Sequence, residues 1–181
     1  MIAHINTFGE EQSIKDHLYG TAKRAEEFAE EFGCGAAGNF CGILHDIGKY
    51  SKQFQERIRN PENTKKVDHS TAGALEALHI SNHNIPFSMV IAGHHSGLMD
   101  GGSYRFSGEE AGTFFGRLKS KIPDYSGWEK DIKVGPAEVP PFCIKGDNRM
   151  FSMAFFIRMM YSCLVDADYL DTELFMNGAI W

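Results

Sequence analysis

Two ionisable residues, His45 and Asp46, interrupt the otherwise apolar stretch from Ile43 to Gly48. A carboxylate and an imidazole buried side by side destabilise a fold unless other groups compensate their polarity. Both side chains are also standard ligands of divalent metal ions. Any fold of this chain therefore has to bring compensating residues, or a metal ion, to the pair.

Apolar residues recur with the period of an amphipathic helix over most of the chain. In the first third, this pattern predicts a helix from His17 to Phe32, which Gly33 ends, and a second helix from Ala36 to Tyr50. The second helix carries the His-Asp pair on its apolar face. A short third helix is expected over Ser51–Arg59, before Asn60-Pro61.

The second half of the chain is also mainly helical by this pattern, with helices predicted over Ser70–Ile80, Phe87–His95, Gly108–Ile122 and Arg149–Asp171. The last helix is apolar on most faces and is expected to run through the core. Residues 123–148 hold four of the six prolines, so we expect an irregular insertion there, with at most a short hairpin. The predicted fold is an all-α helical bundle with an irregular insertion.

A chain of 181 residues is the size of one domain, and we expect a single domain over residues 1–181. No stretch has the length and purity of a membrane span, since the most apolar segment, Met150 to Val165, is short and carries Arg158. The N-terminus lacks the features of a signal peptide, and the four cysteines form no C-x-x-C pair. A cytoplasmic protein with reduced thiols is expected.

The net charge of −6 argues against a domain that binds DNA through charge alone. The charge is unevenly distributed, however. Residues 49–66, here called the basic segment, contain six basic and two acidic side chains and follow closely on His45-Asp46. This segment is either an ordinary solvated face and loop, or a rim that attracts phosphate groups to the site.

Five histidines and two aspartates form an ordered set of side chains typical of metal ligands. Each histidine alone is more often a hydrogen-bonded core residue than a ligand. Adjacent residues on a helix point about 100° apart, so the pairs His45-Asp46 and His94-His95 can each serve two neighbouring metal positions, or one metal and one substrate. The candidate ligands are His17, His45, Asp46, His69, His94, His95 and Asp168.

The order of these residues resembles that of the HD superfamily of metal-dependent phosphohydrolases. Their flanks more narrowly resemble the HD nuclease domain of the CRISPR type I interference nuclease-helicase, over nearly the whole chain from His17 to Glu173. Five blocks carry this resemblance: His17-Leu18-x-x-Thr21-Ala22, His45-Asp46-Ile47-Gly48-Lys49, Asp68-His69-Ser70-Thr71-Ala72-Gly73-Ala74, Gly93-His94-His95-Ser96-Gly97-Leu98, and Leu164-Val165-Asp166-Ala167-Asp168 with Asp171-Thr172-Glu173.

The resemblance implies a metal-dependent nuclease that degrades single-stranded DNA after guide-RNA-directed recognition in antiviral defence. It implies two partners, a superfamily 2 helicase and the guide-RNA surveillance complex, and no membrane. The chain contains no G-x-x-x-x-G-K-[ST] motif, so the helicase is expected elsewhere. The chain is then either a stand-alone nuclease subunit or an excised domain, and its end at Trp181 favours the excised domain.

The resemblance also implies a two-metal site. Asp46 is the expected bridging ligand, since a carboxylate can span two ions about 3.5–4 Å apart. Three residues would complete the shell of each ion: His17, His45 and Asp168 for one, and His69, His94 and His95 for the other. Asp166 competes with Asp168, which is preferred because it alone occupies the family's Ala-Asp-aromatic-Leu position.

Lys49 lies three residues after Asp46 and shares its helical face. It is predicted to hold a phosphate oxygen or to stabilise the transition state, and the alternative is a surface lysine at a helix end. Asp46 and Lys49 are thus the predicted catalytic residues. Thr172, one turn beyond Asp168, is a further candidate for a hydrogen bond to the site. Three histidines outside the blocks are expected to be structural or exposed: His4, His79 and His83.

One or two divalent transition-metal ions are the expected cofactors. The histidine-rich shell favours manganese, cobalt, nickel or iron over magnesium, which prefers oxygen ligands and retained water. Such an ion lowers the pKa of a bound water toward neutrality, and the resulting hydroxide would attack phosphorus in line. No separate protein nucleophile is required.

Two other functions stay open. A nucleotide or cyclic-nucleotide phosphohydrolase would use the same ligands on the same scaffold, although the segment Ser96-Gly97-Leu98-Met99 differs from the Gly-Tyr-Pro segment of the cyclic-dinucleotide branch. The third function is a metal-stabilised module that docks a partner without catalysis. The presence of every expected ligand argues against this third function.

Overall fold

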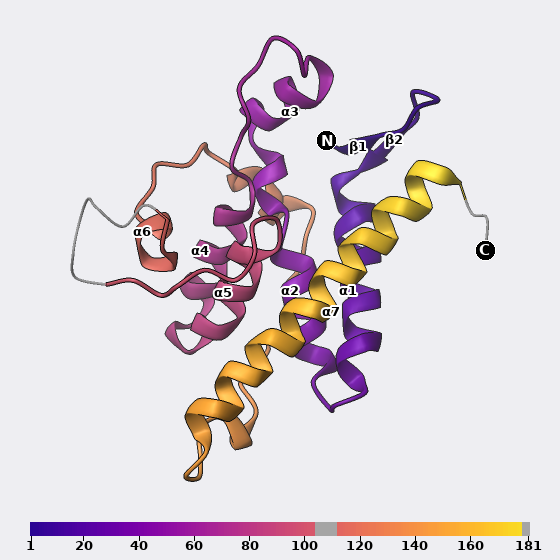
Figure 1. The fold of residues 1–181 in the computed structure, drawn as a ribbon. Coiled ribbons are helices and arrows are strands. Elements are labelled where there is room, and N and C mark those ends of the chain that lie inside the picture. The colour runs from indigo at the N-terminus through magenta and orange to yellow at the C-terminus, as the bar shows by residue number, and fades with distance from the viewer. Residues whose placement is uncertain (104–111, 179–181) are drawn as a thin grey trace.

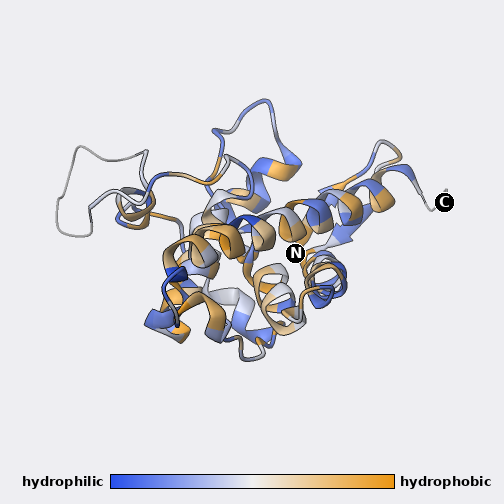
Figure 2. Cartoon of the chain, turned by 60° about the horizontal axis from the view of Figure 1, so that its bottom comes forward, coloured by the Kyte–Doolittle hydropathy of each residue, from blue (hydrophilic) through white to orange (hydrophobic). Residues whose placement is uncertain are grey.

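The structure, a computed structural model, describes residues 1–103 and 112–178. Within these ranges it contains seven α-helices and one small two-stranded sheet (Figure 1). The all-α fold predicted from the sequence is therefore confirmed. In Figure 2, hydrophobic residues gather where the helices meet, and hydrophilic residues are more frequent on the outer helices and loops.

Three helices form the centre of the fold: α1 (Ile14–Glu30), α2 (Gly35–Leu44) and α7 (Arg149–Asn177). Helix α1 begins after Ser13, whose Oγ accepts a hydrogen bond from the Asp16 N–H at 3.0 Å. Helices α1 and α2 lie very close together, because a Cβ on Gly42 would be only 2.4 Å from the Cα of Ala22. Helix α7 packs across both (Figure 1).

A second pair of helices, α4 (Ser70–Ile80) and α5 (Ile85–Gly93), packs against this centre. Aromatic rings join the two parts of the core. The ring of Phe87 in α5 lies 5.6 Å from that of Phe40 in α2 and 6.1 Å from that of Phe156 in α7, measured between centroids. This packing fixes the ends of α2, α4 and α5 relative to the middle of α7.

The helices that precede His45-Asp46 and His94-His95 end earlier than the sequence pattern predicts. Helix α2 ends at Leu44, and a 3-10 turn follows over Ile47–Tyr50, so the predicted helix from Ala36 to Tyr50 is wrong in its last third. The backbone of Asp46 has φ −121° and ψ 20°, outside the helical range, and its side chain is fully buried. Helix α5 likewise ends one residue before His94.

A hairpin forms at the N-terminus, where the sequence pattern did not predict one. Strand β1 (Ile2–Ile5) pairs antiparallel with β2 (Glu11–Ser13), and Gly9 in the turn has a φ of +81°. Gln55 of helix α3 (Lys52–Arg59) holds the hairpin in place, because its amide group bonds both the N–H and the C=O of Ile2. The hairpin thereby lies beside the 3-10 turn that follows Asp46.

The insertion over residues 123–148 is irregular, as predicted, with two 3-10 turns at Ser126–Lys130 and Pro141–Cys143 and no strand. It is anchored in the core by Trp128 and Ile132, which are almost fully buried. Helix α6 (Phe114–Leu118) is shorter than the predicted helix over Gly108–Ile122, part of which lies outside the described residues.

Helix α7 extends six residues beyond the predicted end at Asp171. One face packs in the core, but a row of large apolar side chains near its N-terminus is exposed: Met150, Phe151, Phe155 and Met159. By length and composition alone the helix is able to cross a membrane. This corrects the prediction that no stretch has that length and purity, although the core helix of a water-soluble protein meets the same test.

Candidate metal centre

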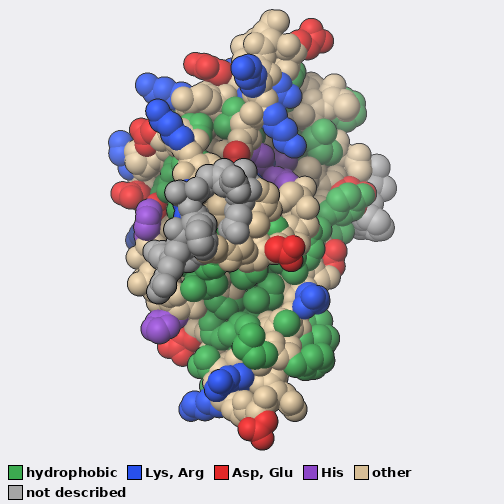
Figure 3. All heavy atoms as spheres, turned by 60° about the vertical axis from the view of Figure 1, so that its left-hand side comes forward, with side chains coloured by type: hydrophobic (Ala, Val, Ile, Leu, Met, Phe, Trp, Pro, Cys, Tyr) green, Lys and Arg blue, Asp and Glu red, His purple; other side chains and the backbone are tan. Residues whose placement is uncertain are grey.

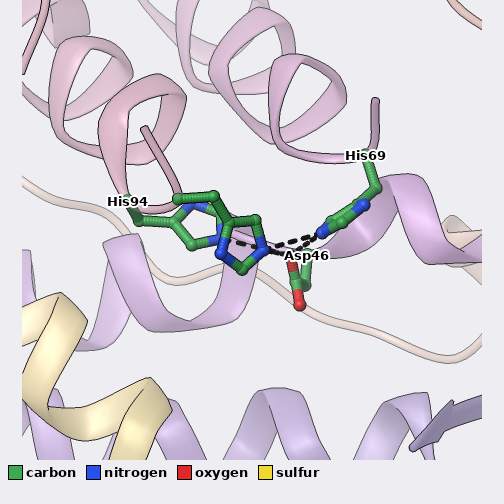
Figure 4. Close-up of side chains that lie close together, drawn as sticks. Asp46, His69 and His94 are labelled. Carbon is green, nitrogen blue, oxygen red and sulfur yellow. Dashed lines mark hydrogen bonds and ion pairs between the residues drawn. The ribbon is translucent and has the colours of Figure 1, made fainter. Parts of the chain in front are cut away.

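Six side chains from five parts of the fold converge on the carboxylate of Asp46, which is buried at the end of α2. The side chains of Asp46, His69 and His94 point toward one another between the helices in Figure 4. Two groups of possible metal ligands share Asp46: His17, His45, Asp46 and Asp168 are called the inner group, and Asp46, His69, His94 and His95 the outer group. The sequence-predicted ligands are all brought together.

The inner group lies on the Oδ2 side of Asp46. The Nε2 atoms of His17 and His45 are each 3.5 Å from Oδ2 and 3.2 Å from one another. Asp168 of α7 closes the group, since its Oδ1 is 3.3 Å from His17 Nε2 and 3.5 Å from His45 Nε2. Both histidine side chains are fully buried.

The outer group lies on the Oδ1 side of the same carboxylate. The Nε2 atoms of His94, His69 and His95 are 3.3, 3.4 and 3.9 Å from Oδ1. This group faces outward, because the side chain of His95 is 44% exposed and that of His69 15% exposed. In Figure 3 histidine side chains lie in a hollow of the surface, with Lys and Arg side chains above them.

Three of the histidines are oriented by a backbone carbonyl at their second ring nitrogen, Nδ1. The Nδ1 atom of His45 lies 2.7 Å from the Gly42 carbonyl, and that of His94 lies 2.7 Å from the Ile91 carbonyl. The Nδ1 atom of His69 is 3.2 Å from the carbonyl oxygen of Val67. Donation from Nδ1 fixes the tautomer in which Nε2 has a free lone pair, as in metal-binding histidines.

The polar atoms at the centre fit a metal ion. Among the described residues, both oxygens of Asp46 and the Nε2 of His94 are buried and accept no hydrogen bond. Lys49 Nζ is only 2.7 Å from Asp46 Oδ2, but it approaches at an angle unsuited to a hydrogen bond. Ligand atoms about 2.1 Å from one ion lie roughly 3.0 to 3.4 Å apart, close to the spacings in both groups.

A sequence comparison agrees with this geometry. The family model of the HD domain matches residues 14–124, more than half of the chain. The chain belongs to the HD domain family. The matched region holds Asp46 and the five clustered histidines, whereas Asp168 lies beyond it. HD domains are typically metal-dependent hydrolases. A search of curated proteins found no significant match.

The centre of this HD domain lowers the pKa of two carboxyl groups, those of Asp46 and Asp168. Burial alone would raise the pKa of Asp46, but the Lys49 ammonium and the neighbouring imidazoles hold it well below its usual range. Burial also opposes ionisation of Asp168, and hydrogen bonds from histidines lower its pKa. Burial disfavours a charged His17, yet the surrounding carboxylates raise its pKa to about 10. The inner group therefore attracts a positive charge, which a metal cation supplies when it replaces the proton.

The two more exposed imidazoles of the outer group, those of His69 and His95, are neutral. Burial lowers the pKa of His95 to about 4, helped by the nearby His94. Burial also lowers the pKa of His69, and the Lys49 ammonium adds to the shift. Neutral imidazoles bind metal ions without first losing a proton.

Lys49 of the HD domain is buried rather than on the surface, which rules out the surface-lysine alternative. Its side chain is 4% exposed. Its Nζ lies 2.9 Å from Nε2 of His4, a half-buried residue of strand β1. No sequence pattern connected His4 with the centre, because the hairpin that carries it was not predicted.

Asp171 is a part of the centre for which the sequence pattern predicted no role. Its Oδ2 accepts hydrogen bonds from His17 Nδ1 and from Gln12 Nε2, both at 2.9 Å. It lies three residues after Asp168 on the same face of α7, and this spacing was the available signal. Asp166 is exposed, so the structure places Asp168, and not its competitor, beside the histidines. The ligand role of Asp168 stays a prediction.

A close contact between two backbone segments and the side chain of Arg117 hold the outer group in position. A Cβ on Gly48 would lie 2.2 Å from the carbonyl oxygen of His69, so only glycine lets these two segments approach. Arg117 of α6 donates hydrogen bonds to Asp68 at 2.9 Å, Ser70 Oγ at 2.7 Å, Thr71 Oγ1 at 2.8 Å and the Ala92 carbonyl at 2.6 Å. It thereby ties the start of α4 to the end of α5.

Proposed function

We propose that this HD domain is a metal-dependent phosphodiesterase that cleaves single-stranded DNA, as the nuclease of a CRISPR type I antiviral system. The observation that carries the proposal is the division of Asp46 between two ligand groups, one buried and one open to the surface. Two such groups would hold two neighbouring metal ions, an arrangement typical of enzymes that hydrolyse phosphate esters.

The chemistry divides between the ions and the chain. Divalent ions, when bound, activate a water molecule and neutralise charge on the phosphate. The chain contributes an ionised Asp46 that both groups share and histidines whose Nε2 atoms are held toward it. Lys49 would hold a non-bridging phosphate oxygen, a role supported by its Nζ lying 2.7 Å from Asp46 Oδ2 and by its lining a cavity together with His69 and His95 of the outer group.

A polymeric substrate is favoured over a small nucleotide by the position of the outer group. It opens at the surface through His95, and the basic segment begins at Lys49 and continues into exposed lysines. The sequence blocks around the ligands resemble the CRISPR nuclease more closely than the cyclic-dinucleotide branch. We further propose that a superfamily 2 helicase delivers the strand, recruited by the guide-RNA surveillance complex in the cytoplasm, without a membrane.

The test incubates metal-stripped protein with circular single-stranded DNA, duplex DNA and a panel of nucleotides, each with manganese, nickel or magnesium. We expect the circular strand to be cut with manganese or nickel, and Asp46→Ala to abolish cutting. Asp166→Ala is the matched control, because it removes an exposed carboxylate from the same protein.

Two other outcomes of this experiment would contradict the proposed nuclease activity. Turnover of nucleotides without DNA cleavage would replace the proposal with an HD nucleotide phosphohydrolase. Tight metal binding with no hydrolysis of any substrate would favour a non-enzymatic module.

A further inference from the structure

A cavity of about 470 Å³ opens directly beside the outer group. Lys49, His69 and His95, which belong to the metal centre or contact it, line the cavity together with the polar residues His4 and Thr172. Most of the remaining lining is apolar and includes Phe54 and Ile58 of α3. The cavity therefore extends from the polar metal centre into a largely apolar space.

Two cationic side chains, Lys49 and Arg57, line the cavity. The Nη1 of Arg57 donates to the carbonyl oxygens of Pro61 and Thr64 and so ties this guanidinium to the loop. Lys49 remains as the cation beside the metal centre. A phosphate group would thus bind at the metal end, and whatever is attached to it would lie against apolar side chains.

Phe54 connects the two ends of the cavity. Its ring centroid is 5.2 Å from that of His69, at an interplanar angle of 70°, and 5.7 Å from Lys49 Nζ. The residue is held in the first turn of α3, where the Ser51 Oγ accepts a hydrogen bond from its N–H. The ring is half-buried, which leaves part of it open to the cavity.

We propose that this cavity binds one unpaired nucleobase next to the scissile phosphate, stacked on Phe54. The inference rests on the proposed function and narrows it to strands whose bases are free. A base inside a duplex has to leave its stack before it can enter such a pocket, whereas a single strand presents it directly. The apolar wall also predicts tolerance of base identity, because stacking on an aromatic ring does not depend on hydrogen bonds.

The experiment combines a protein variant with a substrate that lacks one base. Single-stranded oligonucleotides carry one abasic site at successive positions around the cut, and both binding and kcat/KM are measured for wild type and Phe54→Leu. We expect wild type to lose about tenfold or more at one position adjacent to the cut. Phe54→Leu should lose as much on intact DNA, with no further loss on that abasic substrate.

Two further variants separate stacking from folding. Phe54→Trp keeps an aromatic face and should retain wild-type binding, and Phe151→Leu changes an exposed phenylalanine on α7 and should have no effect. Equal cleavage of intact and abasic strands at every position would overturn the cavity assignment alone. A wild-type protein that hydrolyses nucleotides but neither binds nor cuts DNA would overturn the proposed function as well.

Discussion

At the scale of single residues, the centre is organised by Asp46 and by the groups that hold its neighbours. Each carboxylate oxygen faces a different set of imidazoles, so one buried side chain belongs to two ligand groups. His45, His69 and His94 are oriented through Nδ1 by backbone carbonyls, two of which lie in the last turns of α2 and α5. His17 is the exception, because a side chain, Asp171, orients it.

Asp171→Asn should weaken metal binding without removing a ligand. The amide has lost the charge that holds His17 Nδ1–H, so the ring is less well oriented and less basic. We expect metal affinity to fall by about 10- to 100-fold, the usual effect of changing such a partner. Titration calorimetry with manganese measures it, and Asp166→Asn on the same helix is the control. Equal affinities in both variants would show that Asp171 does not orient a ligand.

The sequence predicted the converging residues well because each of the five blocks is a local pattern. The pair His45-Asp46 could be distinguished from ordinary polar core residues only because the other sequence blocks accompany it. Asp171 and His4 were missed for a different reason: their contacts join residues 154 and 45 positions apart in the chain. Contacts over such distances depend on how helices and strands pack, which no local pattern contains.

At the scale of elements, the centre forms where helices end. Helix α2 ends just before His45-Asp46, α5 ends just before His94-His95, and α4 begins directly after His69. The apolar periodicity predicted these helices correctly but placed their C-terminal ends too late, beyond the ligand residues. Periodicity depends on the spacing of apolar residues and does not reveal that the backbone leaves the helix at Asp46. The N-terminal hairpin was missed because its strands have only four and three residues.

Arg117→Ala should disrupt the outer group while leaving the inner group intact. The substitution removes the hydrogen bonds that join Asp68 before His69 to Ala92 before His94. Because the ion pair is partly exposed, we expect a loss of about 1–3 kcal/mol in the free energy of unfolding. Elemental analysis and calorimetry should find two bound metal ions per chain in wild type and one in this variant.

Arg158→Ala is the matched control for this variant, since Arg158 is exposed and donates a hydrogen bond to the Ala154 carbonyl of its own helix. Retention of two ions by Arg117→Ala, at wild-type affinity, would contradict a role for the arginine in positioning α4 against α5. Arg117→Lys keeps the charge but not the fork of donors, and should behave like the alanine variant in metal binding.

At the scale of the whole molecule, an acidic chain presents a basic region next to its metal centre. The remainder of the protein is acidic, so any attraction of a polyanion is local to the basic segment. Within that segment the residues are not equivalent. Lys49 belongs to the centre and Arg57 is bonded to loop carbonyls, whereas Lys52, Lys65 and Lys66 are exposed. Only the structure separates these roles, since the sequence shows a uniform run of charge.

Replacement of Lys52, Lys65 and Lys66 by glutamine should weaken binding of single-stranded DNA and reduce its dependence on salt. Each phosphate contact on a single strand contributes about 0.7 to the slope of log K against log salt, so three lost contacts reduce the slope by roughly 2. Fluorescence anisotropy at several salt concentrations measures it. Replacement of Lys23, Lys133 and Lys145, which are exposed outside the segment, makes the same change in net charge. Equal slopes for the two triple variants would show that net charge, and not a basic rim, governs binding.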